Sequence, residues 1–111
     1  MFSDNRRVVA AVVSASSGDK AIFGYGISAS YQSMTNLVSN TGVVSTDTTG
    51  VGTARVYLAA AGFGGDKAIF GYGDISASYQ SMTNLVSNTG VVSTDTTGVG
   101  TARTGLAAAT Y

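Results

Sequence analysis

Residues 18–55 read GDKAIFGYGISASYQSMTNLVSNTGVVSTDTTGVGTAR, and residues 65–103 repeat this stretch with a single change, the insertion of Asp74 after Gly73. Gly18 and Gly65 are 47 residues apart, and the offset becomes 48 after the insertion. A duplication of this size is typical of stacked copies of one supersecondary unit, none of which buries its apolar face alone. The repeat therefore predicts two equivalent units in contact with each other.

The sequence outside the repeated block continues its pattern. Arg7, Arg55 and Arg103 are each followed by a run of small residues, VVAAVV, VYLAAA and TGLAAA respectively. We therefore divide the chain into residues 1–64, the first unit with a divergent opening strand, and residues 65–111, the second unit with the start of a third repeat.

Within each unit the residue pattern favours strands over helices. No segment keeps a 3.6-residue period, and Thr, Val and Ser recur where helix propensity is poor. The expected strands are residues 8–14, 20–25, 33–38 and 43–46. Residues 56–62 are the counterpart of 8–14, and residues 67–72 repeat the strand at 20–25. The loop at 39–42, Ser-Asn-Thr-Gly, joins two of these strands as a hairpin. The predicted fold class is all-β.

The order of these features resembles the kelch repeat of β-propellers. Such a repeat has an arginine, an apolar inner strand, a strand ending in Gly-Gly, a Tyr-bearing strand, a turn and a last strand. Here the matching features are Arg55 and residues 58–61, 67–73, 84–86, 87–90 and 91–92. Kelch repeats are about 50 residues long. The resemblance implies two four-stranded antiparallel propeller blades plus an extra terminal strand.

The chain also looks like the repetitive propeller-type sequences of marine bacteriophages and environmental metagenomes. That second resemblance implies a virion-associated or extracellular setting and a structural role. Near identity of the two copies is equally typical of recent duplication and of deliberate design.

Two blades are too few for a ring, because propellers close with about four to eight. We therefore expect a homo-oligomer of two to four copies. Residues 103–111 and 8–13 resemble the same inner strand and would compete for one position in a closed ring. One of them would then be displaced or cross to a neighbour, or else the assembly would stay open and grow as a fibre. A β-solenoid, whose repeats are usually shorter, and a cross-β assembly are the remaining alternatives.

The composition argues against catalysis and against several partners. The chain has no His and no Cys, which removes the commonest general base and all thiolate ligands. Six basic and six acidic residues give zero net charge, so nothing predicts a nucleic-acid or membrane partner. The apolar run at residues 8–13 is shorter than the core of a signal peptide, which is about 7–15 residues. We expect no enzyme activity, no cofactor and no metal.

Four residues are the candidates for facing a ligand: Arg55, Arg103, Tyr25 and Tyr72. The two arginines occupy equivalent positions before an inner strand, where a ring of guanidinium groups could bind anions or sugar hydroxyls. The tyrosines recur with the repeat and could stack on sugars. The alternative for both pairs is structural, with the arginines bonded to backbone carbonyls of a neighbouring unit and the tyrosines packed between units.

The repeated aspartates also allow two interpretations. Asp19 and Asp66 precede one strand of each unit, and Asp47 and Asp95 precede Thr-Thr-Gly. Such oxygens could form a repeated cation site, but Asx-turns explain the placement better. Asp74 lengthens a loop by one residue, which loops tolerate at little cost.

The sequence therefore predicts a non-catalytic, self-assembling β-propeller fragment with a structural or adhesive role. The alternative is a lectin-like module that presents one glycan site per blade. A truncated enzyme-type propeller is a third, weaker interpretation.

Overall fold

The computed structural model describes residues 18–111, and every regular element in this range is a β-strand. The first repeat holds β1 (Ala21–Gly24), β2 (Ile27–Ser28), β3 (Ser30–Tyr31) and β4 (Thr35–Val38). The second holds β6 (Lys67–Gly71), β7 (Asp74–Ile75), β8 (Ser78–Tyr79) and β9 (Thr83–Val86). β5 (Ala59–Phe63) lies before residue 65 but pairs with β6, so it is grouped with the second repeat. The all-β prediction is confirmed for this part of the chain. Within it there is no helix long and apolar enough to cross a membrane.

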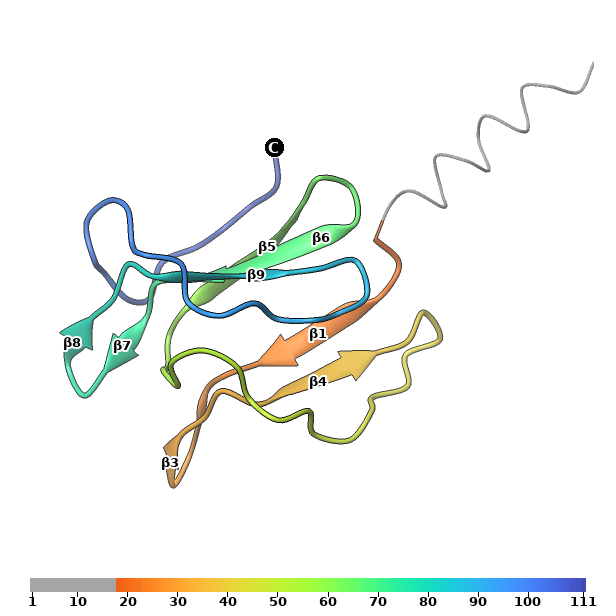
Figure 1. The fold of residues 1–111 in the computed structure, drawn as a ribbon, viewed down its shortest axis with the longest axis horizontal. Coiled ribbons are helices and arrows are strands. Elements are labelled where there is room, and N and C mark those ends of the chain that lie inside the picture. The colour runs from red at the N-terminus through yellow and green to blue at the C-terminus, as the bar shows by residue number, and fades with distance from the viewer. Residues whose placement is uncertain (1–17) are drawn as a thin grey trace, which may run out of the picture.

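The strands form small antiparallel sheets, none of which closes on itself (Figure 1). In the second repeat β6 is central, paired with β5 from Ala59↔Gly71 to Phe63↔Lys67 and with β9 from Ala68↔Val86 to Gly71↔Thr83. In the first repeat β1 pairs with β4 in the register that β6 and β9 share, as identical sequences should. Among residues 18–111, β1 has no partner on its other edge.

A further extended segment lies beside β4 and beside β9. Val44 and Thr48 form isolated bridges with Val38 and Thr35. Their counterparts in the second repeat are the Val86↔Val92 and Thr83↔Thr96 bridges. These segments were expected to be strands, but only single bridges form, because the polar Ser-Thr-Asp-Thr run pairs through side chains as well as through its backbone.

The predicted strand boundaries hold for β1, β4 and β6 to within two residues, whereas β5 begins three residues later than expected. Tyr57 has a φ of 59°, a left-handed conformation that interrupts an extended run. The strand therefore starts only at Ala59. The expected opening strand at 8–14 lies outside the described residues.

Each repeat also carries a small tip hairpin that the sequence analysis did not predict. In the first, β2 and β3 pair as Ser28↔Ser30 around Ala29 alone. In the second, β7 and β8 pair as Ile75↔Ser78 around two residues. Asp74 supplies the extra residue and adds a bridge to Val56. The insertion thus changes the hairpin and leaves the larger sheets in register.

The hydrophobic core lies between the two repeats. Its buried members are Tyr25 from the first repeat and Phe70, Val86 and Val92 from the second. The Tyr25 and Phe70 rings are 5.1 Å apart at an interplanar angle of 60°, a favourable tilted arrangement. The two units therefore bury apolar surface against each other, as a repeat architecture requires.

The C-terminal segment was expected to form the inner strand of a third repeat, but no strand is assigned after Val86. Residues 104–110 instead run beside β5 and the residues before it, and the Thr104 hydroxyl donates to Tyr57 O at 3.4 Å. Gly105 N donates to Tyr57 O at 3.0 Å, and the Thr110 hydroxyl donates to Gly62 O. These contacts join residues at nearly equivalent places in successive repeats, so the segment lies beside its own earlier copy.

Candidate functional site

Arg55 occupies the centre of the boundary between the repeats and has no exposed surface. Its Nε donates to Tyr72 O at 2.7 Å, and its Nη1 donates to Thr53 O at 2.9 Å. Nη2 donates to Asn84 Oδ1 at 2.7 Å. The guanidinium also lies 4.8 Å from the centroid of the Tyr25 ring. A planar fork with several donors is what such a set of acceptors requires, and Lys could not supply it.

Asn84, which is also completely buried, extends this network. Its amide donates to Ser93 O at 3.1 Å and to Asp95 Oδ1 at 2.9 Å. The same carboxylate accepts from the backbone and the hydroxyl of Thr53. The contacts run from the end of the first repeat, through Thr53 and Arg55, to the sheet of the second. They therefore fix the angle between the repeats.

The chain passes closest to this network at Gly52, which has a φ of 83°. A Cβ there would lie 2.5 Å from Asn84 Nδ2 and 2.6 Å from Asp95 Oδ1. Both the space and the backbone conformation therefore require glycine. The glycine lets the backbone of Thr53 reach the Asp95 carboxylate.

The electrostatics of the site follow from these contacts. Burial raises the pKa of the Asp95 carboxyl, but hydrogen bonds from Thr53 and Asn84 and the charge of Arg55 outweigh it. The pKa of Asp95 is therefore lower than its ordinary value. For Tyr25, desolvation raises the pKa of the phenol and exceeds the opposing effect of Arg55. At neutral pH the site holds a guanidinium, a carboxylate and a neutral phenol.

The four sequence candidates fall into two pairs. Tyr25 and Arg55 are buried between the repeats and contact each other. Tyr72 and Arg103 form the equivalent pair at the far end of the second repeat, with the guanidinium 4.7 Å from the ring centroid. Arg103 is exposed and Tyr72 is partly exposed. The Tyr25–Arg55 pair thus lies between the two repeats, and the Tyr72–Arg103 pair is accessible to solvent.

No known family model matches the chain, and no curated protein is significantly similar to it.

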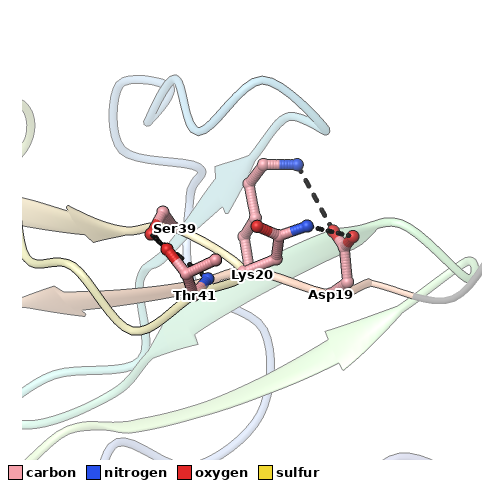
Figure 2. A network of polar contacts seen from close by, with 5 residues as sticks. Asp19, Lys20, Ser39 and Thr41 are labelled. Atoms are coloured by element: carbon pink, nitrogen blue, oxygen red, sulfur yellow. Dashed lines mark hydrogen bonds and ion pairs between the residues drawn. The ribbon is translucent and has the colours of Figure 1, made fainter.

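The aspartates before β1 and β6 each accept from the following lysine and from an asparagine in the loop after β4 or β9. Asp19 accepts from Lys20 Nζ at 3.3 Å and from Asn40 Nδ2 at 3.4 Å, and the Ser39 and Thr41 hydroxyls are 2.9 Å apart in the adjoining loop (Figure 2). The Lys20 hydrogen bond is the main cause of a lowered pKa for Asp19. Between residues 18 and 111 no group of three acidic, His or Cys side chains is placed to hold a metal ion.

The sequence analysis missed Asn84 and did not connect Asp95 with Thr53. Asn84 and Arg55 are 29 residues apart, and Thr53 and Asp95 are 42 apart, so no local motif contains them. One signal was available. Asn and Asp recur at the same positions of both repeats, on a strand and just after one, where β-propensity does not favour them.

Proposed function

We propose that each repeat is one four-stranded propeller blade and that the chain self-associates to complete a propeller with a structural or adhesive role. Three paired strands and the bridged segment at Val92 and Thr96 are the parts expected of one blade. The second repeat supplies all four parts, whereas within residues 18–111 the first repeat supplies three of them, β1, β4 and the bridged segment at Val44 and Thr48. We count each repeat as one blade. Two, three or four copies would give four, six or eight blades, the usual range for closure.

The observation that carries the proposal is the amount of apolar surface left outside the central boundary. The large hydrophobic side chains that are at least half exposed include Phe23, Ile27, Val44, Tyr57, Val91 and Val99. A monomeric protein rarely leaves so many large apolar groups in water. A zero net charge adds no repulsion between copies.

A structural role accounts for Arg55 and Tyr25 better than glycan binding does. Both are buried between the repeats, so neither can meet a sugar while the repeats stay together. A lectin-like module with one site per blade would need equivalent residues exposed in both repeats. We therefore favour assembly.

Native mass in solution tests this proposal. We expect a discrete dimer, trimer or tetramer of the 11.1 kDa chain by native mass spectrometry and light scattering. A stable, folded monomer at micromolar concentration would overturn the proposal. A glycan array run in parallel would favour the lectin alternative if sugar binding were reproducible.

A further inference from the structure

The two repeats carry identical side chains in different surroundings. Phe70 is 5% exposed, whereas its copy Phe23 is 62% exposed. Val92 is 8% exposed, and its copy Val44 is 53% exposed. In the second repeat these side chains face the first repeat. The first repeat presents the same surface, here called the head, and no residue between 18 and 111 covers it.

The opposite end of the molecule, here called the tail, is the far side of the second repeat. It carries the same residues as the side of the first repeat that contacts the second repeat. Arg103 Nη1 donates to Thr101 O at 3.0 Å, as Arg55 does to Thr53 at 2.9 Å. The Tyr72 hydroxyl donates to Val99 O at 2.9 Å, as Tyr25 does to Val51 O at the same distance. The tail arginine and tyrosine thus already hold the conformation seen in the buried boundary.

The head holds the matching acceptors in place. Asn36 Nδ2 donates to Ser45 O at 3.1 Å and to Asp47 Oδ1 at 2.8 Å. The corresponding distances from Asn84 are 3.1 and 2.9 Å. Asn36 Oδ1 therefore points where Asn84 Oδ1 accepts from Arg55. Among residues 18–111 it has no donor of its own.

The tail also has a socket for an aromatic ring. A pocket of about 230 Å³ is lined by residues that include Ile69, Gly71, Tyr72, Arg103 and Leu106. The equivalent residues one repeat earlier include Ile22, Gly24, Tyr25 and Leu58, and Phe70 packs there, with its ring against Gly24 and Tyr25. Phe23 of a second copy is the residue that this socket would receive.

We propose that copies of this chain associate head to tail through these two surfaces. Arg103 of one copy donates to Asn36 Oδ1 and to the Tyr25 carbonyl of the next, and Thr101 donates to Asp47. Phe23 of that next copy enters the socket. The proposal rests on the proposed self-assembly and names the contacts that produce it.

The C-terminal segment of the copy that supplies Arg103 would lie at the edge of β1 of the next copy, an edge that nothing in residues 18–111 pairs with. Residues 106–109 read LAAA, identical to residues 58–61, which lead into β5 and its pairing with β6. A groove of about 1020 Å³ lies between β1 and β5, and Ile22, Leu37 and Phe63 are among the residues that line it. Residues 10–13 of the chain's own N-terminal part read AAVV and share only one position with this LAAA pattern.

Two full-length variants test the proposal by complementation. Arg103→Ala damages the tail and leaves the head intact, whereas Phe23→Ala does the reverse. Each alone should weaken association about 30-fold or more, because a buried charged contact or an aromatic anchor is lost. Mixed in equal amounts, they should form a one-to-one heterodimer through the one undamaged pair of surfaces, detected by native mass spectrometry. Recovery on mixing also shows that both variants are folded.

The outcomes separate this proposal from the broader one. A monomeric wild-type chain would overturn self-assembly itself. A wild-type oligomer whose mass survives both substitutions would overturn the head-to-tail contacts and leave self-assembly standing. An oligomer that survives Arg103→Ala but is lost with Arg7→Ala would show that association depends on Arg7 instead of Arg103, and would overturn the proposed contacts. Two monomeric variants that fail to combine would overturn the head-to-tail geometry.

Discussion

Arg55 donates from Nη2 to Asn84 Oδ1 at 2.7 Å, and neither residue has any exposed surface. This one bond joins the end of the first repeat to β9 in the sheet of the second. It forms only where one repeat follows another, because each partner comes from a different copy of the duplicated block. Substitutions at these two residues therefore report on the contact between the repeats.

Replacement of Arg55 by Lys should destabilise the fold by about 2 kcal/mol or more, because one ammonium cannot serve the acceptors that the guanidinium fork reaches and a hydrogen bond to a charged group contributes about 1.5–3 kcal/mol. Arg103→Lys is the matched control, because the same sequence precedes both arginines, and its effect should stay within about 0.5 kcal/mol. Urea denaturation at a concentration where the protein is unassembled measures both. Equal losses would contradict the assignment of Arg55 as the central contact.

A second matched pair is Asn84→Ala and Asn36→Ala. The first leaves the buried Arg55 donor and the Ser93 carbonyl short of partners, and we expect a loss of about 2 kcal/mol. The second removes the same side chain from a more accessible position and should cost less than half as much. The midpoints of thermal unfolding give the comparison. A larger effect at Asn36 would show that the head is already covered in the monomer.

Phe70→Ala and Phe23→Ala extend the comparison to apolar packing. Removal of a buried phenylalanine typically costs about 3–5 kcal/mol, and Phe70 is 5% exposed in the core between the repeats. Phe23 is 62% exposed, so its replacement by Ala should lower the stability of the unassembled chain by less than about 1 kcal/mol. If Phe23 becomes covered on association, the stability lost in Phe23→Ala will rise with protein concentration, whereas the stability lost in Phe70→Ala will not. Denaturation at two concentrations tests this difference.

The sequence predicted the class of structure, the strands β1, β4 and β6 and the contact between repeats, because these follow from β-branched and aromatic runs and from the duplication itself. It did not predict the delayed start of β5, which depends on the left-handed Tyr57, or the tip hairpins, whose strands have only two residues each. The buried network escaped prediction for a different reason. Identical residues become buried or exposed according to whether a repeat stands next to them, and only their neighbours in space decide which.

The tip hairpin of the second repeat contains strain that can be relieved. Ser76 and Ala77 have φ values of 49° and 67°, the left-handed conformations of a type I′ turn, which favours Asn-Gly. The double substitution Ser76→Asn and Ala77→Gly should therefore stabilise the fold by about 0.5–1 kcal/mol. The rise in the melting temperature measures the gain. An unchanged or lower melting temperature would show that the turn is not strained in solution.

The Asp95 carboxylate should make the boundary between the repeats sensitive to acid. Burial works against its ionisation, but the hydrogen bonds from Thr53 and Asn84 hold its pKa below the ordinary value of 3.8. A group with a depressed pKa stabilises the folded state above its unfolded pKa, and this contribution is lost as the pH falls through the folded pKa. Stability should therefore be level near neutral pH and decline below about pH 4.

Asp95→Asn keeps the shape of the side chain but places an amide where Thr53 and Asn84 both donate. It should lower stability at pH 7 and flatten the decline at acid pH, because the titrating group is gone. Asp47→Asn is the matched variant in the first repeat. Asp47 accepts a hydrogen bond from Asn36, but within residues 18–111 no further repeat packs against that side. Asp47→Asn should leave the acid profile of the unassembled chain nearly unchanged. Urea midpoints between pH 3 and 7 for the wild type and both variants decide the matter, and an acid decline that persists in Asp95→Asn would assign it to other carboxylates.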